Sequence, residues 1–173
     1  MKKYIIAGLL LSVALFSCKK SKEDKIARKW QAYELNSPQM DNMLAEQQAF
    51  IDTFGKNSDA ATNIAIYNTA NVDSLRHAMQ AEVDDLKALQ QHAVTNTWFD
   101  IRKNGIAVMN FSGQVDSVNW YFDEEGALIL DQMKLKGTGT KIVMEIVSLE
   151  DTMMKLRFTE NGLTSSVTFR PEK

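Results

Sequence analysis

Few side chains of this 173-residue chain have the type and spacing that catalysis or metal binding requires. The two histidines, His77 and His92, are 15 residues apart in the sequence. On one straight helix that separation is about 22 Å, which is too long for both side chains to bind one metal ion. Asp73 and His77 could form half of a site, but no second His or Cys stands near them. We expect an exposed pair on one helix face and no metal site.

The carboxylates and hydroxyls also lack a catalytic pattern. Asp123, Glu124 and Glu125 precede a glycine but lack the alternating oxygen ligands of a calcium loop, so a solvated hairpin turn is predicted. Glu145 lies in an apolar strand and is expected to point outward. No serine stands in a nucleophile elbow, and the chain has no glycine-rich phosphate loop. We therefore expect no catalytic residue, no cofactor and no enzymatic activity.

The cysteine at position 18 is the only one in the chain. It follows two lysines and the apolar run Tyr4–Phe16, which is the layout of a secretory signal over residues 1–17. The run is too short to span a bilayer, for which about 20 apolar residues are needed. Leu15-Phe16-Ser17-Cys18 resembles the lipobox of bacterial lipoproteins. The resemblance implies that Cys18 becomes a lipidated first residue carrying fatty acyl chains such as palmitate. The alternative is a cleaved signal that leaves a free cysteine.

Composition limits the partners of the mature chain. Its net charge of −2 becomes −4 once Lys2 and Lys3 are removed with the signal. Mild acidity without a basic stripe argues against nucleic acid and against binding to anionic lipid by charge alone. One cysteine cannot form an intramolecular disulfide, so the core must hold the fold. Residues 18–25 are almost entirely polar and are predicted to be a solvated tether.

The segment 37–95 has helical periodicity. Ser37 and Pro38 are typical of a helix N-cap and first helical residue, and Gly55 of a helix end. A second apolar stripe at helical spacing runs from Asn71 to Ala93, while residues 58–70 between the two are ambiguous. We predict an antiparallel helical pair, with Met40, Met43 and Phe54 as candidates for a lid.

Alternation at period two replaces the helical pattern after Thr95. The strand candidates are Trp98–Arg102, Ile106–Phe111, Val118–Phe122, Ala127–Gln132, Lys141–Leu149, Met153–Thr159 and Ser165–Arg170. Asn104-Gly105 and Asn161-Gly162 are typical of tight hairpin turns. An earlier strand around Trp30 makes eight. We predict a mainly β domain over 26–173, an eight-stranded antiparallel up-and-down barrel whose first strand pairs with its last, with the helical pair inserted.

A tryptophan-bearing first strand followed by hairpins ending in Met153–Phe158 and Val167–Arg170 resembles the lipocalin-like domain of anchored lipoproteins from bacteria of the Bacteroidota type. The resemblance covers residues 26–36 and 96–173. It implies a protein anchored in the cell envelope, more often in the outer membrane, that binds a small hydrophobic molecule. It also implies an arginine packed over Trp30, for which Arg170 is the best candidate. The glycine usual before that tryptophan is replaced by Arg28.

An eight-stranded barrel either packs solid or holds one small apolar ligand. Both alternatives stay open here. The residues predicted to line a ligand site are Trp98, Phe111, Trp120, Phe122, Met144, Met154 and Phe158. The first hypothesis is thus a lipid-anchored, non-catalytic binder of a hydrophobic ligand. The second is an envelope protein with a solid barrel core whose 37–95 helices bind a partner protein.

Overall fold

The computed structural model describes residues 20–111, 113–160 and 162–172. The predicted signal 1–17 and the predicted lipidation site Cys18 lie outside these residues. The elements are, in chain order, α1 (Lys22–Ile26), β1 (Lys29–Asn36), α2 (Pro38–Thr53), α3 (Ala60–Tyr67), α4 (Asp73–Thr95), β2 (Trp98–Ile101), β3 (Ile106–Phe111), β4 (Gln114–Phe122), β5 (Leu128–Asp131), α5 (Gln132–Lys136), β6 (Lys141–Leu149), β7 (Met154–Glu160) and β8 (Leu163–Pro171).

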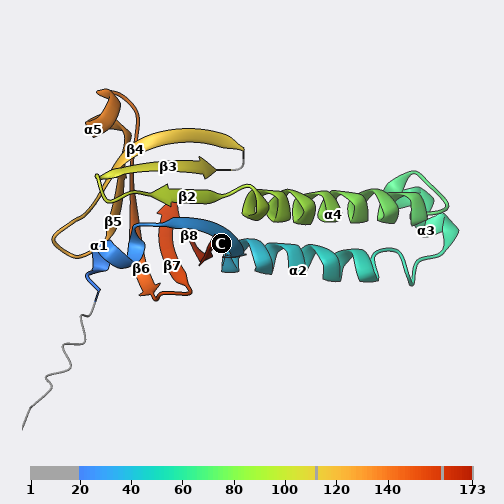
Figure 1. Ribbon diagram of the computed structural model, residues 1–173. Coiled ribbons are helices and arrows are strands. Elements are labelled where there is room, and N and C mark those ends of the chain that lie inside the picture. The colour runs from blue at the N-terminus through green and yellow to red at the C-terminus, as the bar shows by residue number, and fades with distance from the viewer. Residues whose placement is uncertain (1–19, 112, 161, 173) are drawn as a thin grey trace, which may run out of the picture.

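The eight strands form a closed, fully antiparallel barrel in which each strand pairs with its neighbours in the sequence (Figure 1). Closure comes from β1, where Trp30 lies opposite Phe99 of β2 on one side and Pro171 of β8 on the other. The predicted fold class is confirmed, including the pairing of the first strand with the last and the helices inserted after the first strand. A closed ring leaves no sheet edge exposed.

Hairpin turns set the register of the strands. Gly105 follows Asn104 between β2 and β3 and has a φ of 80°, which a residue with a side chain rarely adopts. This turn sets the register of β2 and β3, in which Ile101 lies opposite Ala107. Alternate residues of β3 therefore point into the barrel, where Ala107 and Met109 are buried.

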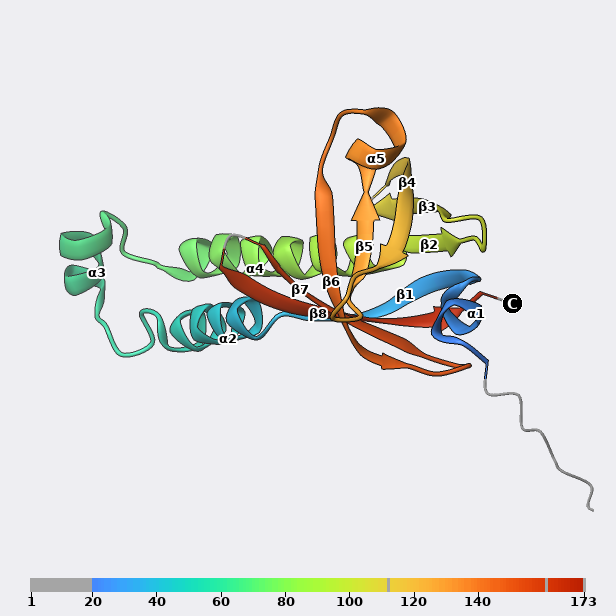
Figure 2. The same ribbon diagram turned by 90° about the vertical axis from the view of Figure 1, so that its left-hand side faces the viewer.

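The helices of residues 37–95 project from one end of the barrel, and we call this segment the helical arm (Figures 1 and 2). α2 and α4 pack against each other through a small core of Leu44, Ile51 and Val83. The far tip of the arm contains α3, which occupies the stretch that had been ambiguous in sequence. Asp59 caps α3 by accepting a hydrogen bond of 2.7 Å from the backbone N–H of Thr62.

The start of α2 differs from the predicted cap. Pro38 is its first residue, as expected, but the Ser37 side chain forms no capping bond. Instead, the hydroxyl of Ser165 on β8 lies 3.0 Å from that of Ser37, to which it donates. The residue therefore links the arm to the barrel. At the other end of α2, Gly55 has a φ of 66°, and a Cβ there would lie 2.2 Å from a methyl carbon of Val72.

The N-terminal end of the described chain is more ordered than a solvated tether. Residues 22–26 form α1, and the hydroxyl of Ser21 caps it by accepting from the N–H of Asp24 at 3.1 Å. Ile26, the last residue of α1, is fully buried in the barrel core. β1 starts three residues later, at Lys29. A capped turn that buries one apolar residue can form in a polar segment whose composition alone predicts a flexible chain.

The barrel has a closed end next to α1 and a mouth next to the helical arm; Figure 2 shows the two at opposite ends of the molecule. The indole N–H of Trp30 donates to the carbonyl of Ile26 at 2.8 Å in the closed end. The arginine beside this ring is Arg28, with its guanidinium carbon 5.4 Å from the ring centroid. The prediction that Arg170 packs over Trp30 was wrong. The guanidinium carbon of Arg170 lies 3.7 Å from the ring centroid of Tyr33. Neighbouring residues on a strand face opposite sides of the sheet, and since Phe169 is buried in the barrel, Arg170 faces outward.

Candidate functional site

The barrel interior is solid at its closed end. The core of the barrel contains the fully buried side chains of Trp30, Phe99 and Phe169. The rings of Phe99 and Phe169 stack with their centroids 4.9 Å apart. Met144 and Met154, which were predicted to line a ligand site, are 3% and 0% exposed and belong to the same core. These residues therefore fill the barrel instead of lining an open cavity.

The other predicted ligand-binding residues divide between the two ends of the barrel and its outer face. Trp120 is buried and its indole N–H donates to the carbonyl of Arg102 at 2.7 Å. Phe122 lies near α1, with the ammonium of Lys22 at 4.8 Å from its ring centroid. Phe111 and Phe158 lie at the mouth.

Trp98 does not line the interior, which corrects the prediction. Its neighbour Phe99 is fully buried inside the barrel, so the alternation along β2 turns Trp98 to the outer face. The ammonium of Lys29, from β1, lies 5.2 Å from its ring centroid. The pattern of β2 contains two adjacent aromatic residues and could not indicate which of them faces inward.

A cavity of about 160 Å³ lies in the barrel mouth, beneath the C-terminal end of α4. Its lining is Ala32, Leu35, Ala93, Val94, Thr97, Phe111, Phe158 and Val167. The one polar side chain among them is already satisfied, because the hydroxyl of Thr97 donates to the carbonyl of Ala93 at 2.7 Å. The cavity therefore presents an apolar surface, which suits a hydrocarbon group better than water.

A larger groove of about 360 Å³ adjoins this cavity between the helical arm and the β7–β8 hairpin. Leu35 and Phe158 line both spaces. The remaining lining of the groove is Ser37, Met40, Leu86, Leu89, Gln90, Glu160, Leu163 and Ser165. Its lining is mainly apolar, and its polar groups come from Ser37, Gln90, Glu160 and Ser165. Together the two spaces can accept an elongated apolar molecule with a polar end.

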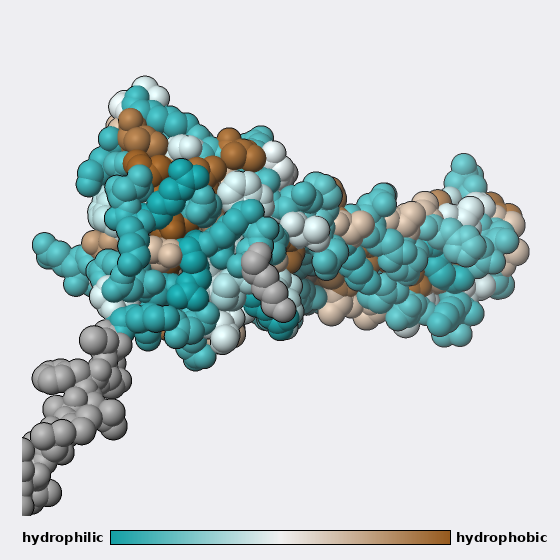
Figure 3. Space-filling model, viewed as in Figure 1, coloured by the Kyte–Doolittle hydropathy of each residue, from teal (hydrophilic) through white to brown (hydrophobic). Residues whose placement is uncertain are grey.

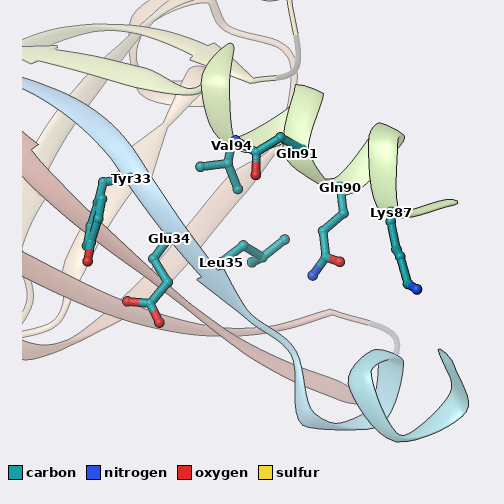
Figure 4. Close-up of a pocket in the computed structure, with 7 residues that line it drawn as sticks. All are labelled: Tyr33, Glu34, Leu35, Lys87, Gln90, Gln91 and Val94. Carbon is teal, nitrogen blue, oxygen red and sulfur yellow. The ribbon is translucent and has the colours of Figure 1, made fainter. Parts of the chain in front are cut away.

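A third hollow lies on the outer side of the same wall (Figure 4). In this view Leu35 extends from β1 toward α4 and Val94 lies at the end of α4 above it, and both residues also line the mouth cavity. Glu34 and Lys87 give this hollow a charged lining. Leu35 and Val94 thus lie between a hollow with charged groups and the apolar mouth cavity.

The lid candidates differ in position. Met40 lines the groove, as a lid residue should. Phe54 lies at the opposite end of α2, where its ring centroid is 4.9 Å from that of Tyr67 of α3. Phe54 therefore belongs to the tip of the arm. Met43 is exposed and lines neither the cavity nor the groove.

Sequence reasoning missed the contribution of α4 to this site. Ala93, Val94, Leu86 and Leu89 come from its C-terminal half, and Leu163 is the first residue of β8. Helical periodicity marked an apolar stripe on α4 but could not indicate that its end covers the barrel mouth. The short link of Asn96 and Thr97 between α4 and β2 was the available signal, because it forces the helix to end at the barrel rim.

Ionisable groups with altered pKa lie outside the mouth cavity. The backbone N–H of Lys134 holds the pKa of Asp131 below its ordinary value, and a hydrogen bond from the Lys136 side chain does the same for the pKa of Asp116. Both carboxyls stabilise the surroundings of α5. Within residues 20–172, apart from positions 112 and 161, no three His, Cys, Asp or Glu side chains gather to hold a metal ion.

No helix in the described part of the chain is long and apolar enough to cross a membrane. Comparisons of the chain with models of protein families, with curated proteins and with solved structures found no match. The fold supports many unrelated activities, so function has to be argued from the mouth cavity and the groove.

Proposed function

We propose that this protein is a lipid-anchored, lipocalin-like binding protein of the bacterial cell envelope that holds a small hydrophobic ligand without catalysis. The observation that carries the proposal is the apolar cavity at the barrel mouth, together with the groove beside the arm that shares Leu35 and Phe158 with it. A closed barrel with apolar residues at one open end is compatible with such a ligand.

The dimensions favour a narrow molecule over a bulky one. A dry cavity of about 150 Å³ accommodates a benzene-sized group, so the mouth cavity fits one ring or a short alkyl segment. The groove is large enough for a longer chain. We therefore propose a ligand with one hydrocarbon end in the barrel mouth and a polar end near Ser37, Gln90 and Glu160, which lie on the groove.

The proposed anchor fits the position of the mouth. Cys18 precedes the described residue Lys20 by two positions, a chain distance of about 7 Å. Lys20 lies at the closed end, where its ammonium is 3.1 Å from Asp151. If Cys18 carries the acyl chains, the closed end faces the membrane and the mouth faces away from it. We propose the outer membrane as the location.

The test of ligand binding is a fluorescence titration of residues 19–173 with the neutral apolar fluorophore N-phenyl-1-naphthylamine. We expect saturable enhancement that weakens at least tenfold in Phe158→Ser, since Phe158 lines both spaces. Leu163→Ser is a second variant at an exposed residue of the groove, and it should also weaken binding without affecting folding. Val143→Ser, on the exposed outer face of β6, is the control. Absence of saturation, or equal binding by all variants, would refute the proposal.

The anchor has its own test. Metabolic labelling with an alkyne analogue of palmitate should label the full-length chain and should fail with Cys18→Ser. The unlabelled variant should leave the membrane fraction. Equal labelling of both chains would contradict the assignment of Cys18.

A further inference from the structure

The two flanks of the helical arm differ in chemistry. One flank is polar and internally bonded: the amide of Gln48 on α2 donates to Gln80 on α4 at 2.8 Å, and Gln80 donates in turn to Asp84 at 3.0 Å. Near the tip, the guanidinium of Arg76 bonds to Asp73 and to the carbonyl of Phe54. The two glutamines and the terminal nitrogens of Arg76 thus find their partners within the arm, while the Arg76 Nε is buried without one among the described residues.

The opposite flank exposes apolar side chains. At 100° per residue, Met43 and Phe50 lie on the side of α2 away from Gln48, and Leu75, Leu86 and Leu89 lie on the side of α4 away from Gln80. Because the helices are antiparallel and the glutamines bond to each other, these five residues share one side of the arm. We call them the apolar flank. They are 37–65% exposed, and the space-filling view shows apolar patches among the polar residues along the arm (Figure 3).

Two carboxylates lie in the middle of the apolar flank. Glu46 is two residues before Gln48 and Glu82 is two residues after Gln80, so the antiparallel register places them at the same level. Glu46 is three residues from Met43 and four from Phe50, and Glu82 is four residues from Leu86 and seven from Leu75. Each carboxylate therefore shares a helix side with these apolar residues. The arm as a whole carries eight acidic and three basic residues, a net charge of −5.

This charge pattern decides between possible occupants. Two copies meeting face to face would bring four carboxylates together, and none of the three basic residues of the arm (Lys56, Arg76 and Lys87) lies on the apolar flank to pair with them. An anionic membrane surface would be repelled for the same reason. A helix with leucine-type side chains and nearby lysines or arginines matches both the apolar residues and the acids.

We propose that the apolar flank binds one amphipathic, basic helix of a partner protein, which completes a three-helix bundle with α2 and α4. α2 has 16 residues and is therefore about 24 Å long, so the partner segment needs about four turns. Its apolar stripe packs on Phe50, Leu75 and their neighbours, and its cationic side chains reach Glu46 and Glu82. Leu86 and Leu89 also line the groove beside the barrel mouth, so the partner helix meets the proposed ligand site at this end of the flank. Met43, Phe50 and Leu75 line neither the groove nor the mouth cavity and belong to the partner surface alone.

The test uses two 18-residue peptides with one leucine pattern, one carrying lysines and the other glutamates at the remaining positions. Binding of each fluorescently labelled peptide to residues 19–173 is measured by anisotropy. We expect the lysine peptide to bind at least tenfold more tightly than the glutamate peptide. The double variant Phe50→Ser/Leu75→Ser should weaken binding of the lysine peptide at least tenfold. It should leave the naphthylamine titration unchanged, because neither residue lines the mouth cavity or the groove.

Matched controls separate the flank from general acidity. Glu46→Gln/Glu82→Gln and Asp41→Asn/Asp84→Asn remove the same charge from exposed positions of the same two helices. Asp41 and Asp84 are seven and four residues from Gln48 and Gln80, so they lie on the polar flank, and Asp84→Asn keeps a side-chain oxygen that can accept from Gln80. The glutamate pair should weaken binding of the lysine peptide at least fivefold more than the aspartate pair does. Equal effects of the two pairs, or equal binding of the two peptides, would overturn the proposal. So would a dimer in sedimentation equilibrium that Phe50→Ser/Leu75→Ser dissociates, since a second copy would then cover the flank.

Discussion

Filling the mouth cavity should stabilise the protein and abolish ligand binding at the same time. Ala93 lies on α4 and lines the cavity of about 160 Å³. Ala93→Leu adds three carbon atoms, which such a cavity can hold because about 150 Å³ accommodates benzene. At about 0.8 kcal/mol per buried methylene, full burial would contribute about 2.4 kcal/mol. Imperfect packing lowers the expected gain to about 1–2 kcal/mol.

Chemical denaturation and the naphthylamine titration measure the two effects on one sample. Ala88→Leu is the matched control, because it adds the same atoms to an exposed position of the same helix. The control should change the free energy of unfolding by less than about 0.5 kcal/mol and leave probe binding intact. Ala93→Leu should lower probe affinity more than tenfold.

Opposite changes in stability and binding would be hard to produce by general damage to the fold. If Ala93→Leu is destabilised while Ala88→Leu is neutral, the position has no space for the added atoms. If Ala93→Leu binds the probe as the wild type does, the probe occupies another site. Either result would refute the cavity as the ligand site.

Three further predictions concern the supports of the barrel and the arm. Trp30→Phe removes the indole hydrogen bond to Ile26 and leaves space in the core, so the free energy of unfolding should fall by about 2–3 kcal/mol in urea titrations. Gly55→Ala forces a Cβ against Val72, so hydrogen exchange in α2 and α3 should accelerate at least tenfold while the barrel stays protected. Asp131 has a folded-state pKa below its unfolded value, so its stabilisation is complete above about pH 4 and is lost as the pH falls through the folded pKa. Asp131→Asn should therefore lower stability near neutral pH and flatten its loss in acid.

The barrel followed from local patterns that leave little freedom. Asn104 and Gly105 define a tight turn, and alternation in segments such as Met154–Phe158 gives both the strand and its buried face. The strand around Trp30 had no neighbour in sequence to pair with. Its partners followed from closure, because an unpaired edge on either side would be unfavourable.

The site was predicted only in part because it depends on tertiary placement. Phe111 and Phe158 were expected near a ligand and lie at the mouth, whereas Met154 fills the core and Trp98 faces outward. Strand alternation fixes the side of a residue but not its height in the barrel. The closure of the mouth by Val94 could not be derived from periodicity, since it requires the orientation of the arm relative to β1.

The central claim is that a hydrocarbon ligand occupies the barrel mouth, and methyl NMR tests it most directly. Residues 19–173 with labelled Leu and Val methyl groups are titrated with dodecanol. The account predicts shifts at Leu35, Val94 and Val167, which line the cavity, and none at Leu128 of the solid core or at Val143 of the outer face. Shifts confined to Val143 and other exposed residues, or no shifts at saturating dodecanol, would contradict it.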